Sequence, residues 1–177
     1  AYLVASGSLP PGVPADVYAL LARMARDRGV RLVLDASGEA LRLAGREGVF
    51  LWKPSLRELE LLAGVSGVDE ARLDGLAREL VRAGACELLV LSLGSGGALW
   101  MTKDDGGRIA APAVPYASGV GAGDSMVAGM VHRLLGGGTF AEVARYGVAA
   151  ASASVMNPGT ALCQPTEVER LYAAMQR

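Results

Sequence analysis

The sequence has few of the residues that mark several large classes of protein. Only two of its 177 residues are cysteines, Cys86 and Cys163, too few for a metal cluster or a disulfide framework. Aromatic residues make up 5% and the net charge is −1, so no basic or stacking surface for nucleic acid is expected. No apolar run reaches the length of a membrane span. We therefore expect a cytoplasmic protein with neither nucleic acid nor a membrane as partner.

Hydrophobic residues, by contrast, are abundant. They make up 51% of the chain, enough for one sizeable core, and neither a repeat nor a linker interrupts it. We therefore expect a single domain over residues 1–177. Two of the 17 cationic residues are lysines, Lys53 and Lys103, and Lys53 stands between a predicted strand and Pro54. That position favours Lys53 as a selected point charge.

Short apolar runs alternate with helical patterns along the first half of the chain. This alternation is typical of an α/β fold with a mainly parallel sheet. Residues 98–102 and a short strand near 109 predict a local hairpin, and two long helices follow it. In the helix near 15–28, one face carries Val17, Leu20, Leu21 and Met24. The expected strands are 2–5, 31–35, 49–52 and 88–92, and the expected helix N-caps are Ser55, Asp69, Thr139 and Thr166.

Small polar or charged residues follow each of the four expected parallel strands. In open α/β sheets, ligands bind beyond the carboxyl ends of the strands, all on one edge. We expect these segments to meet at that edge, with the glycine-rich turn at Gly121 on the same edge. The segments are Ser6-Gly7-Ser8, Asp35-Ala36-Ser37-Gly38, Lys53-Pro54-Ser55 and Ser92-Leu93-Gly94.

The run Val120-Gly121-Ala122-Gly123-Asp124-Ser125 places two glycines and an acid where a turn enters an apolar helix. The first N–H groups of a helix have no partner within it, and the positive end of the helix dipole lies behind them, which favours a phosphate. Asp124 stands beside this site and could accept a proton from a hydroxyl that attacks the phosphate. Taken alone, however, an acid in the first helical turn is often just a favourable dipole or capping interaction.

Six motifs in order resemble the phosphofructokinase B group of ribokinase-like sugar kinases, above all its phosphosugar kinases. The likeness spans nearly the whole chain. It implies a ribokinase-like three-layer α/β/α sandwich and ATP-dependent phosphorylation of a phosphosugar of the fructose 6-phosphate or fructose 1-phosphate class. The motifs are 6–12, 35–41, 53–58, 92–99, 120–127 and 147–160.

The resemblance implies a role for individual residues. Asp124 matches the catalytic base, and the N–H groups of Gly121, Ala122 and Gly123 match the anion hole. Asp35 and Glu58 match acids that organise Mg²⁺, and Ser8 matches a residue near the sugar phosphate. The positions that match the ATP site are Lys53, Ser55, Ser92, Gly94, Gly97 and Ser152, and those that match a K⁺ loop are Ser118, Val120, Asn157 and Gly159.

Several of these residues also have a purely structural interpretation. Glu58 can close a capping box with Ser55, and Asp35 can cap a turn. Gly94 and Gly97 can serve a hairpin turn, and Ser152 can be a small packing residue. Asn157-Pro158-Gly159 favours a turn whatever it binds.

The chain also departs from the family pattern. Ser55 stands where Asn is usual, Gly119 where Thr is usual, and Ala161 where a larger polar residue is frequent. The resemblance covers the C-terminal portion of such kinases, so the N-terminal strands and the lid, which also forms the homodimer of full-length members, are expected to be missing. A non-catalytic nucleotide-binding module or truncated pseudo-kinase is the alternative. A dinucleotide-binding oxidoreductase is disfavoured, because its glycine motif should directly follow the first strand.

Overall fold

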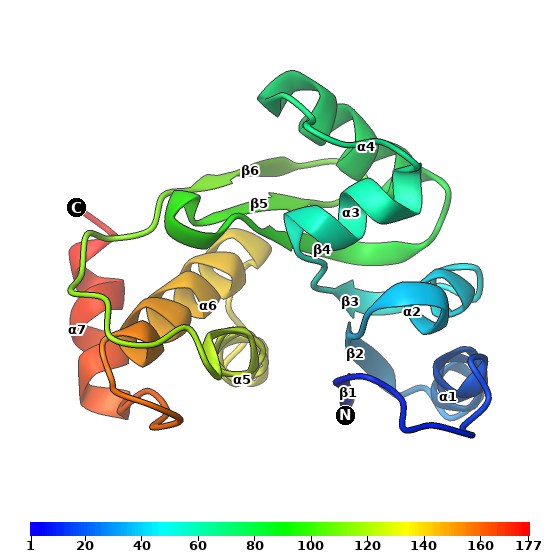
Figure 1. Ribbon diagram of the computed structural model, residues 1–177, viewed down its shortest axis with the longest axis horizontal. Coiled ribbons are helices and arrows are strands. Elements are labelled where there is room, and N and C mark those ends of the chain that lie inside the picture. The colour runs from blue at the N-terminus through cyan, green and yellow to red at the C-terminus, as the bar shows by residue number, and fades with distance from the viewer. The chain divides into compact units, whose positions relative to one another are not determined.

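The computed structural model describes residues 1–177, and its helices and strands are labelled in Figure 1. The chain divides into two compact units. Unit 1 comprises Ala1–Leu93 and Leu99–Gly106, and unit 2 comprises Gly94–Ala98 and Gly107–Arg177. The single domain expected from the sequence stays a prediction.

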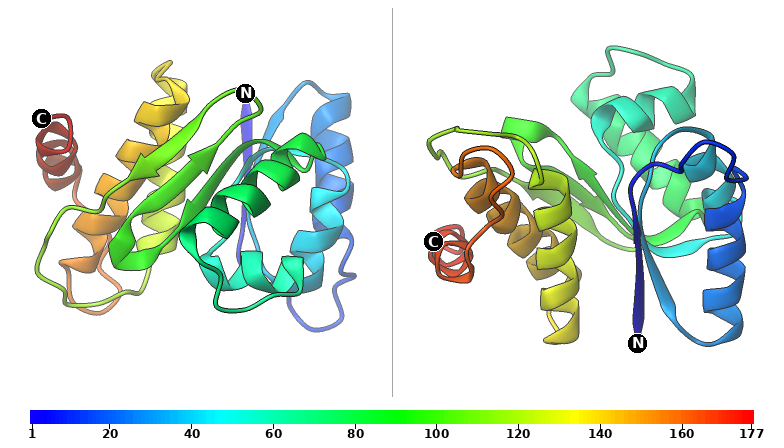
Figure 2. Two further views of the ribbon diagram at one scale, coloured as in Figure 1. Left: turned by 90° about the horizontal axis from the view of Figure 1, so that it is seen from above. Right: turned by 60° about the horizontal axis from the view of Figure 1, so that its bottom comes forward.

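Strands and helices alternate through unit 1, as the sequence predicts. The six strands form one sheet in the order β1-β2-β3-β4-β5-β6, which can be followed in Figure 2. The elements up to the sixth strand are β1 Tyr2–Ser6, α1 Val17–Asp27, β2 Arg31–Asp35, α2 Gly38–Gly45, β3 Val49–Trp52, α3 Leu56–Ala63, α4 Glu70–Arg82, β4 Cys86–Ser92, a 3₁₀ turn Gly94–Gly96, β5 Ala98–Met101 and β6 Gly106–Ile109.

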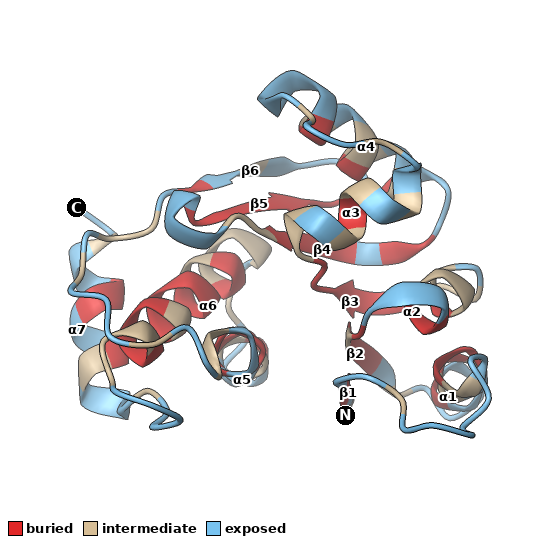
Figure 3. Ribbon diagram, in the orientation of Figure 1, coloured by how far each residue is buried: buried red, intermediate tan, exposed pale blue.

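Strands β1 to β4 are parallel. The register pairs Ser6 with Asp35 at the end of β1 and β2, and Leu51 with Leu88 between β3 and β4. All four residues of β3 are buried, as are Leu88 to Leu91 of β4 (Figure 3). Such continuous apolar runs are typical of parallel strands that are covered on both faces. The mainly parallel sheet predicted from the sequence is confirmed.

Helix α1 buries only part of the predicted face: Val17 and Leu21 are partly buried and pack against the core of unit 1. Leu20 and Met24 are 45% and 41% exposed, whereas Tyr18, Ala22 and Ala25 belong to the core of unit 1. The prediction that Leu20 and Met24 lie on the core face was therefore wrong. The small side chain of alanine allows the helix backbone to lie close to the sheet. A pattern based on large apolar residues does not predict this face.

Three of the four predicted N-caps are confirmed. Ser55 and Thr139 each form a capping box with a glutamate three residues later, and the Asp69 side chain accepts a hydrogen bond from the Arg72 N–H. Thr166 is not a cap, because helix α7 (Pro165–Ala174) begins one residue before it, with Gln164 as N-cap. Proline at the first helical position starts this helix instead, since its fixed φ suits the helix and its missing N–H needs no partner.

Unit 2 is built mainly from α7 and two longer helices, α5 Ala122–Leu135 and α6 Phe140–Val155. Glycine allows α5 and α6 to approach closely. A Cβ at Gly129 would lie 2.7 Å from the Ala150 Cβ, and one at Gly147 would lie 2.6 Å from the Met130 Cγ. Helix α7 packs on α6 through a cluster that includes Tyr146 and Tyr172, whose ring centroids are 5.0 Å apart. None of the helices in either unit has both the length and the apolar character needed to cross a bilayer.

Candidate active site

The carboxyl ends of β1 to β4 meet at one edge of the sheet in unit 1, as expected. Beyond the regular strands, the pairing continues as an isolated parallel bridge between Ser55 and Ser92. The Gly7 N–H donates to the Asp35 carbonyl at 2.8 Å, and the Lys53 N–H donates to the Leu34 carbonyl at 3.0 Å. Four segments that are far apart in the sequence are therefore joined by backbone hydrogen bonds where a ligand is expected.

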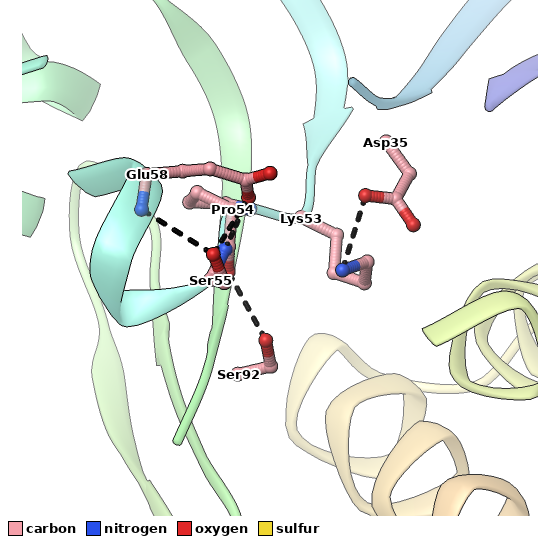
Figure 4. Close-up of polar contacts among 6 residues, drawn as sticks. All are labelled: Asp35, Lys53, Pro54, Ser55, Glu58 and Ser92. Carbon is pink, nitrogen blue, oxygen red and sulfur yellow. Dashed lines mark hydrogen bonds and ion pairs between the residues drawn. The ribbon is translucent and has the colours of Figure 1, made fainter. Parts of the chain in front are cut away.

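Lys53 and Asp35 form an ion pair at this edge. The Lys53 Nζ lies 3.1 Å from the Asp35 Oδ1, and Figure 4 shows the two side chains turned toward each other, Lys53 from the residue after β3 and Asp35 from the end of β2. Lys53 is only 5% exposed, and Asp35 is half-buried. A buried ammonium is costly unless it is paired, so Asp35 stabilises Lys53 in this position. The sequence singled out both residues but did not predict that they pair.

Glu58 and Ser55 form the capping box of α3. The Glu58 Oε2 accepts hydrogen bonds from the Ser55 N–H at 2.7 Å and from the Ser55 Oγ at 2.9 Å, while the Glu58 N–H donates to the Ser55 Oγ at 3.3 Å (Figure 4). The capping interpretation of Glu58 is thus confirmed. Its expected role near Mg²⁺ stays a prediction.

Ser92, the last residue of β4, lies at the same edge of the sheet. Its N–H donates to the Pro54 carbonyl at 3.0 Å, and its Oγ lies 3.4 Å from the same carbonyl (Figure 4). Ser92 therefore fixes the backbone between β3 and α3, which carries Lys53 and Ser55. Its expected contact with ATP stays a prediction.

Ser8 lies in the exposed segment after β1. The preceding residue, Gly7, is fixed by two hydrogen bonds, one to Asp35 and one that the Tyr18 hydroxyl donates to the Gly7 carbonyl at 3.0 Å. Sequence reasoning missed Tyr18 as the residue that positions this segment. A tyrosine in the first turn of an amphipathic helix is too common a feature to have revealed it.

In unit 2, the glycine motif forms the N-terminus of α5 as predicted. Gly121 is the N-cap, with φ 77°, and no side chain caps the helix. Such a φ favours glycine, and a Cβ there would also lie 2.9 Å from the Leu162 Cδ2. Asp124 lies in the first helical turn and is exposed, as is Gly123. The Ala122 N–H, expected in the anion hole, donates to the Gly119 carbonyl over 3.3 Å, a long bond that an anion could displace.

The expected K⁺ residues lie in two loops of unit 2 that contact each other. The Ser118 Oγ donates to the Gly159 carbonyl at 2.7 Å and accepts a hydrogen bond from the Val120 N–H at 3.2 Å. The Asn157 side-chain amide donates to the Ala153 and Leu162 carbonyls, both at 3.1 Å, which fixes the second loop. Hydroxyl and carbonyl oxygens are thus brought together, and a hard cation prefers such ligands.

Three other residues expected near ATP also lie in unit 2. Gly97 has φ 89°, and a Cβ there would lie 2.0 Å from the Ile109 carbonyl oxygen, so the local backbone requires glycine. Gly94 has φ 58° and accepts a hydrogen bond from the Gly97 N–H at 3.0 Å. Ser152 is buried in α6. The turn interpretation of the two glycines is supported, and the contacts of all three with ATP stay predictions.

Comparison with known proteins assigns the chain to a class and then to a family. The fold is the ribokinase-like α/β sandwich: a ribokinase from Arabidopsis thaliana, 22% identical, superposes with a TM-score of 0.77 over 93% of this chain and 55% of its own. The family model described as pfkB family carbohydrate kinase matches residues 1–167, and the chain belongs to this family.

Three relatives show which members of the family the chain resembles. ATP-dependent 6-phosphofructokinase isozyme 2 of Mycobacterium tuberculosis is 42% identical over 97% of this chain and 50% of its own length. The 1-phosphofructokinase of Rhodobacter capsulatus is 40% identical over 94% of this chain and 52% of its own. The crystal structure of phosphofructokinase-2 from Escherichia coli in complex with potassium superposes with a TM-score of 0.95 at 38% identity, covering 99% of this chain and 57% of that one. The chain spans about half the length of the curated relatives it matches.

Proposed function

We propose that the chain takes part in ATP-dependent phosphorylation of a phosphosugar hydroxyl, in the fructose 6-phosphate or fructose 1-phosphate class. Membership of the pfkB family and relatives named 6-phosphofructokinase and 1-phosphofructokinase support this proposal. The observation that carries it is the exposed Asp124 in the first turn of α5, behind a glycine N-cap with no side-chain cap. An acid that accepts the hydroxyl proton and helix N–H groups that stabilise the phosphoryl charge are two of the parts used in phosphoryl transfer to an alcohol.

In this proposal, Asp124 is the general base and the turn at Gly121, Ala122 and Gly123 is the anion hole. The sugar hydroxyl oxygen forms a bond to the γ-phosphorus of ATP, and the bond from that phosphorus to the β–γ bridging oxygen breaks. ADP leaves with the bond's electron pair, and the hydroxyl proton passes to the Asp124 carboxylate. The N–H groups of the turn stabilise the charge on the transferred phosphoryl oxygens.

Asp35 and Glu58 are proposed to hold Mg²⁺, and Lys53, Ser55, Ser92, Gly94, Gly97 and Ser152 to surround ATP. The donor chemistry fits Mg²⁺, because this ion is usually bound by one or two carboxylates together with phosphate oxygens and water. No group of three or more acidic, histidine or cysteine side chains is arranged to hold a metal ion. When bound, Mg²⁺ would neutralise charge on the phosphate oxygens.

The remaining expectations are proposed on the same basis. Ser8 would contact the sugar phosphate, and Ser118, Val120, Asn157 and Gly159 would bind K⁺; the potassium complex of Escherichia coli phosphofructokinase-2 supports the second assignment by analogy. A cytoplasmic location and a homodimer of a full-length protein stay predictions. Tetramer formation is a property of an inhibited form of the Escherichia coli relative.

The alternative is a non-catalytic nucleotide-binding module, which Ser55 favours because it stands where the family usually has Asn. ADP release distinguishes the two functions. The purified chain is incubated with ATP, Mg²⁺ and fructose 6-phosphate or fructose 1-phosphate, in KCl and in NaCl, and its melting temperature is measured with and without ATP. A kinase releases ADP only when sugar is present, whereas a binding module shows a thermal shift with ATP and no turnover.

The role of Asp124 is tested with Asp124→Asn. We expect turnover to fall by about 10²- to 10⁴-fold, the range typical of a lost general base, while the dissociation constant for ATP changes little. Glu167→Gln is the matched control, because Glu167 is also an acid in the first turn of a unit 2 helix and pairs with Arg170. Normal turnover in Asp124→Asn, or an equal loss in the control, would remove Asp124 from the mechanism.

A further inference from the structure

Both acids proposed to hold Mg²⁺ already have a partner within unit 1. Asp35 is paired with the buried Lys53 ammonium at 3.1 Å, and the Glu58 Oε2 accepts two hydrogen bonds from Ser55. The first partner carries a full positive charge and is only 5% exposed. Water screens a buried charge poorly, so Lys53 acts strongly on any second cation that approaches Asp35.

The charges at this edge do not favour a divalent ion by itself. A metal ion held by Asp35 and Glu58 would bring its own two positive charges to that of Lys53, so three positive charges would face two carboxylates. The Lys53 side chain is 6% exposed and its backbone is held by the hydrogen bond to Leu34, so the ammonium has little room to move away from Asp35. The missing negative charge has to arrive with the ligand, and a nucleotide polyphosphate supplies several.

We propose that Lys53 is a specificity-determining residue that prevents binding of the free divalent ion at Asp35 and admits it only together with the nucleotide polyphosphate. This inference rests on the proposed function, since it requires that nucleotide phosphates come to this edge. Lys53 then has two consecutive roles. It neutralises Asp35 before the ligand binds, and it adds to the positive charge that attracts the metal–phosphate complex afterwards.

The test uses Mn²⁺ as a paramagnetic substitute for Mg²⁺. Ultrafiltration followed by electron paramagnetic resonance counts the Mn²⁺ retained by the chain, with and without ADP. We expect the wild-type chain to retain Mn²⁺ at least about tenfold more tightly with ADP than without, since a unit charge a few ångströms away outweighs that ratio at low screening. Equal retention without ADP would overturn the proposal. Lack of retention in both conditions, with no thermal shift by ADP, would instead contradict the proposed nucleotide site.

Variants test the residue itself. Lys53→Met keeps the length of the side chain and removes its charge, and we expect it to gain binding of Mn²⁺ without ADP by about tenfold or more. Adding Asp35→Asn to this variant should abolish the gain. Lys103→Met is the control, because Lys103 is the other lysine of the chain and is exposed in the turn after β5. A folded Lys53→Met, checked by circular dichroism, that gains no affinity contradicts the proposal; if it does not fold, the wild-type comparison still decides.

Discussion

At the scale of single residues, two glycines inside helices have opposite surroundings. Gly129 in α5 faces α6, where an added Cβ would lie 2.7 Å from the Ala150 Cβ and 3.1 Å from the Tyr146 carbonyl oxygen. Gly75 in α4 is exposed, and nothing lies within 4 Å of its added Cβ. Sequence alone does not distinguish them, since each interrupts a helical pattern in the same way.

We expect Gly129→Ala to destabilise the chain by about 1–3 kcal/mol, because overpacking outweighs the gain in helix propensity. Gly75→Ala is the matched control and should stabilise by about 0.5–1 kcal/mol, since only the propensity term remains. Urea denaturation measures both. Equal effects of the two substitutions would show that α5 and α6 do not approach as closely as the structure indicates.

The paired side chains of the candidate site show what could not be predicted at this scale. The scarcity of lysine and the position before Pro54 drew attention to Lys53, and Asp35 was recognised at its strand end. Their pairing depends on the lateral order of β2 and β3 and on the rotamers of both side chains, which no local pattern records. The hydrogen bond from Tyr18 to Gly7 was missed for the same reason.

At the scale of the elements, the capping box of α6 combines a hydroxyl and a carboxylate. The pKa of Glu142 is lowered, first by the Thr139 backbone hydrogen bond and then by the Arg133 side chain. The charged form is therefore favoured in the folded chain. This contribution to stability is fully present above the ordinary value of 4.5 and is lost as the pH falls through the lower pKa of the folded chain.

Thr139→Ala is expected to cost about 1 kcal/mol of stability by loss of the cap. Thr166→Ala serves as control and should be close to neutral, because Thr166 lies inside α7 and caps nothing.

Glu142→Gln should destabilise the chain at neutral pH, and the difference in stability between this variant and the wild type should shrink as the pH falls below 4.5. Thermal melts at several pH values measure all three. A difference that stays constant across this range would exclude the Glu142 carboxylate as its source.

The same helices explain why their boundaries were largely predictable. Capping boxes are local, since three residues separate the partners, so Ser55 and Thr139 could be recognised from spacing alone. Thr166 and Glu169 have the same spacing, yet Pro165 begins the helix earlier and Glu169 accepts a hydrogen bond from the Tyr146 hydroxyl at 2.7 Å. Glu169, which the spacing predicts as part of a cap, thus forms a tertiary contact between α6 and α7 instead.

At the scale of the whole molecule, the division into two units falls within strands. Ala98 of β5 belongs to unit 2 and Leu99–Met101 to unit 1, while Gly106 of β6 belongs to unit 1 and the rest of β6 to unit 2. The chain thus passes from one unit to the other inside two strands, with no linker at these crossings. We therefore expect the two units to unfold together, as the single domain predicted from the sequence requires.

Tryptophan fluorescence and far-UV circular dichroism test this prediction in one urea titration. Trp52 and Trp100 both belong to unit 1, so their fluorescence reports that unit alone, whereas the helix signal comes from α1 to α4 in unit 1 and α5 to α7 in unit 2. Unfolding in one step gives the same midpoint and slope by both probes. Gly129→Ala, which acts in unit 2, should then lower the midpoint of the tryptophan signal as much as that of the helix signal. A helix signal that falls at lower urea than the fluorescence, above all in this variant, would mean that unit 2 is a domain of its own.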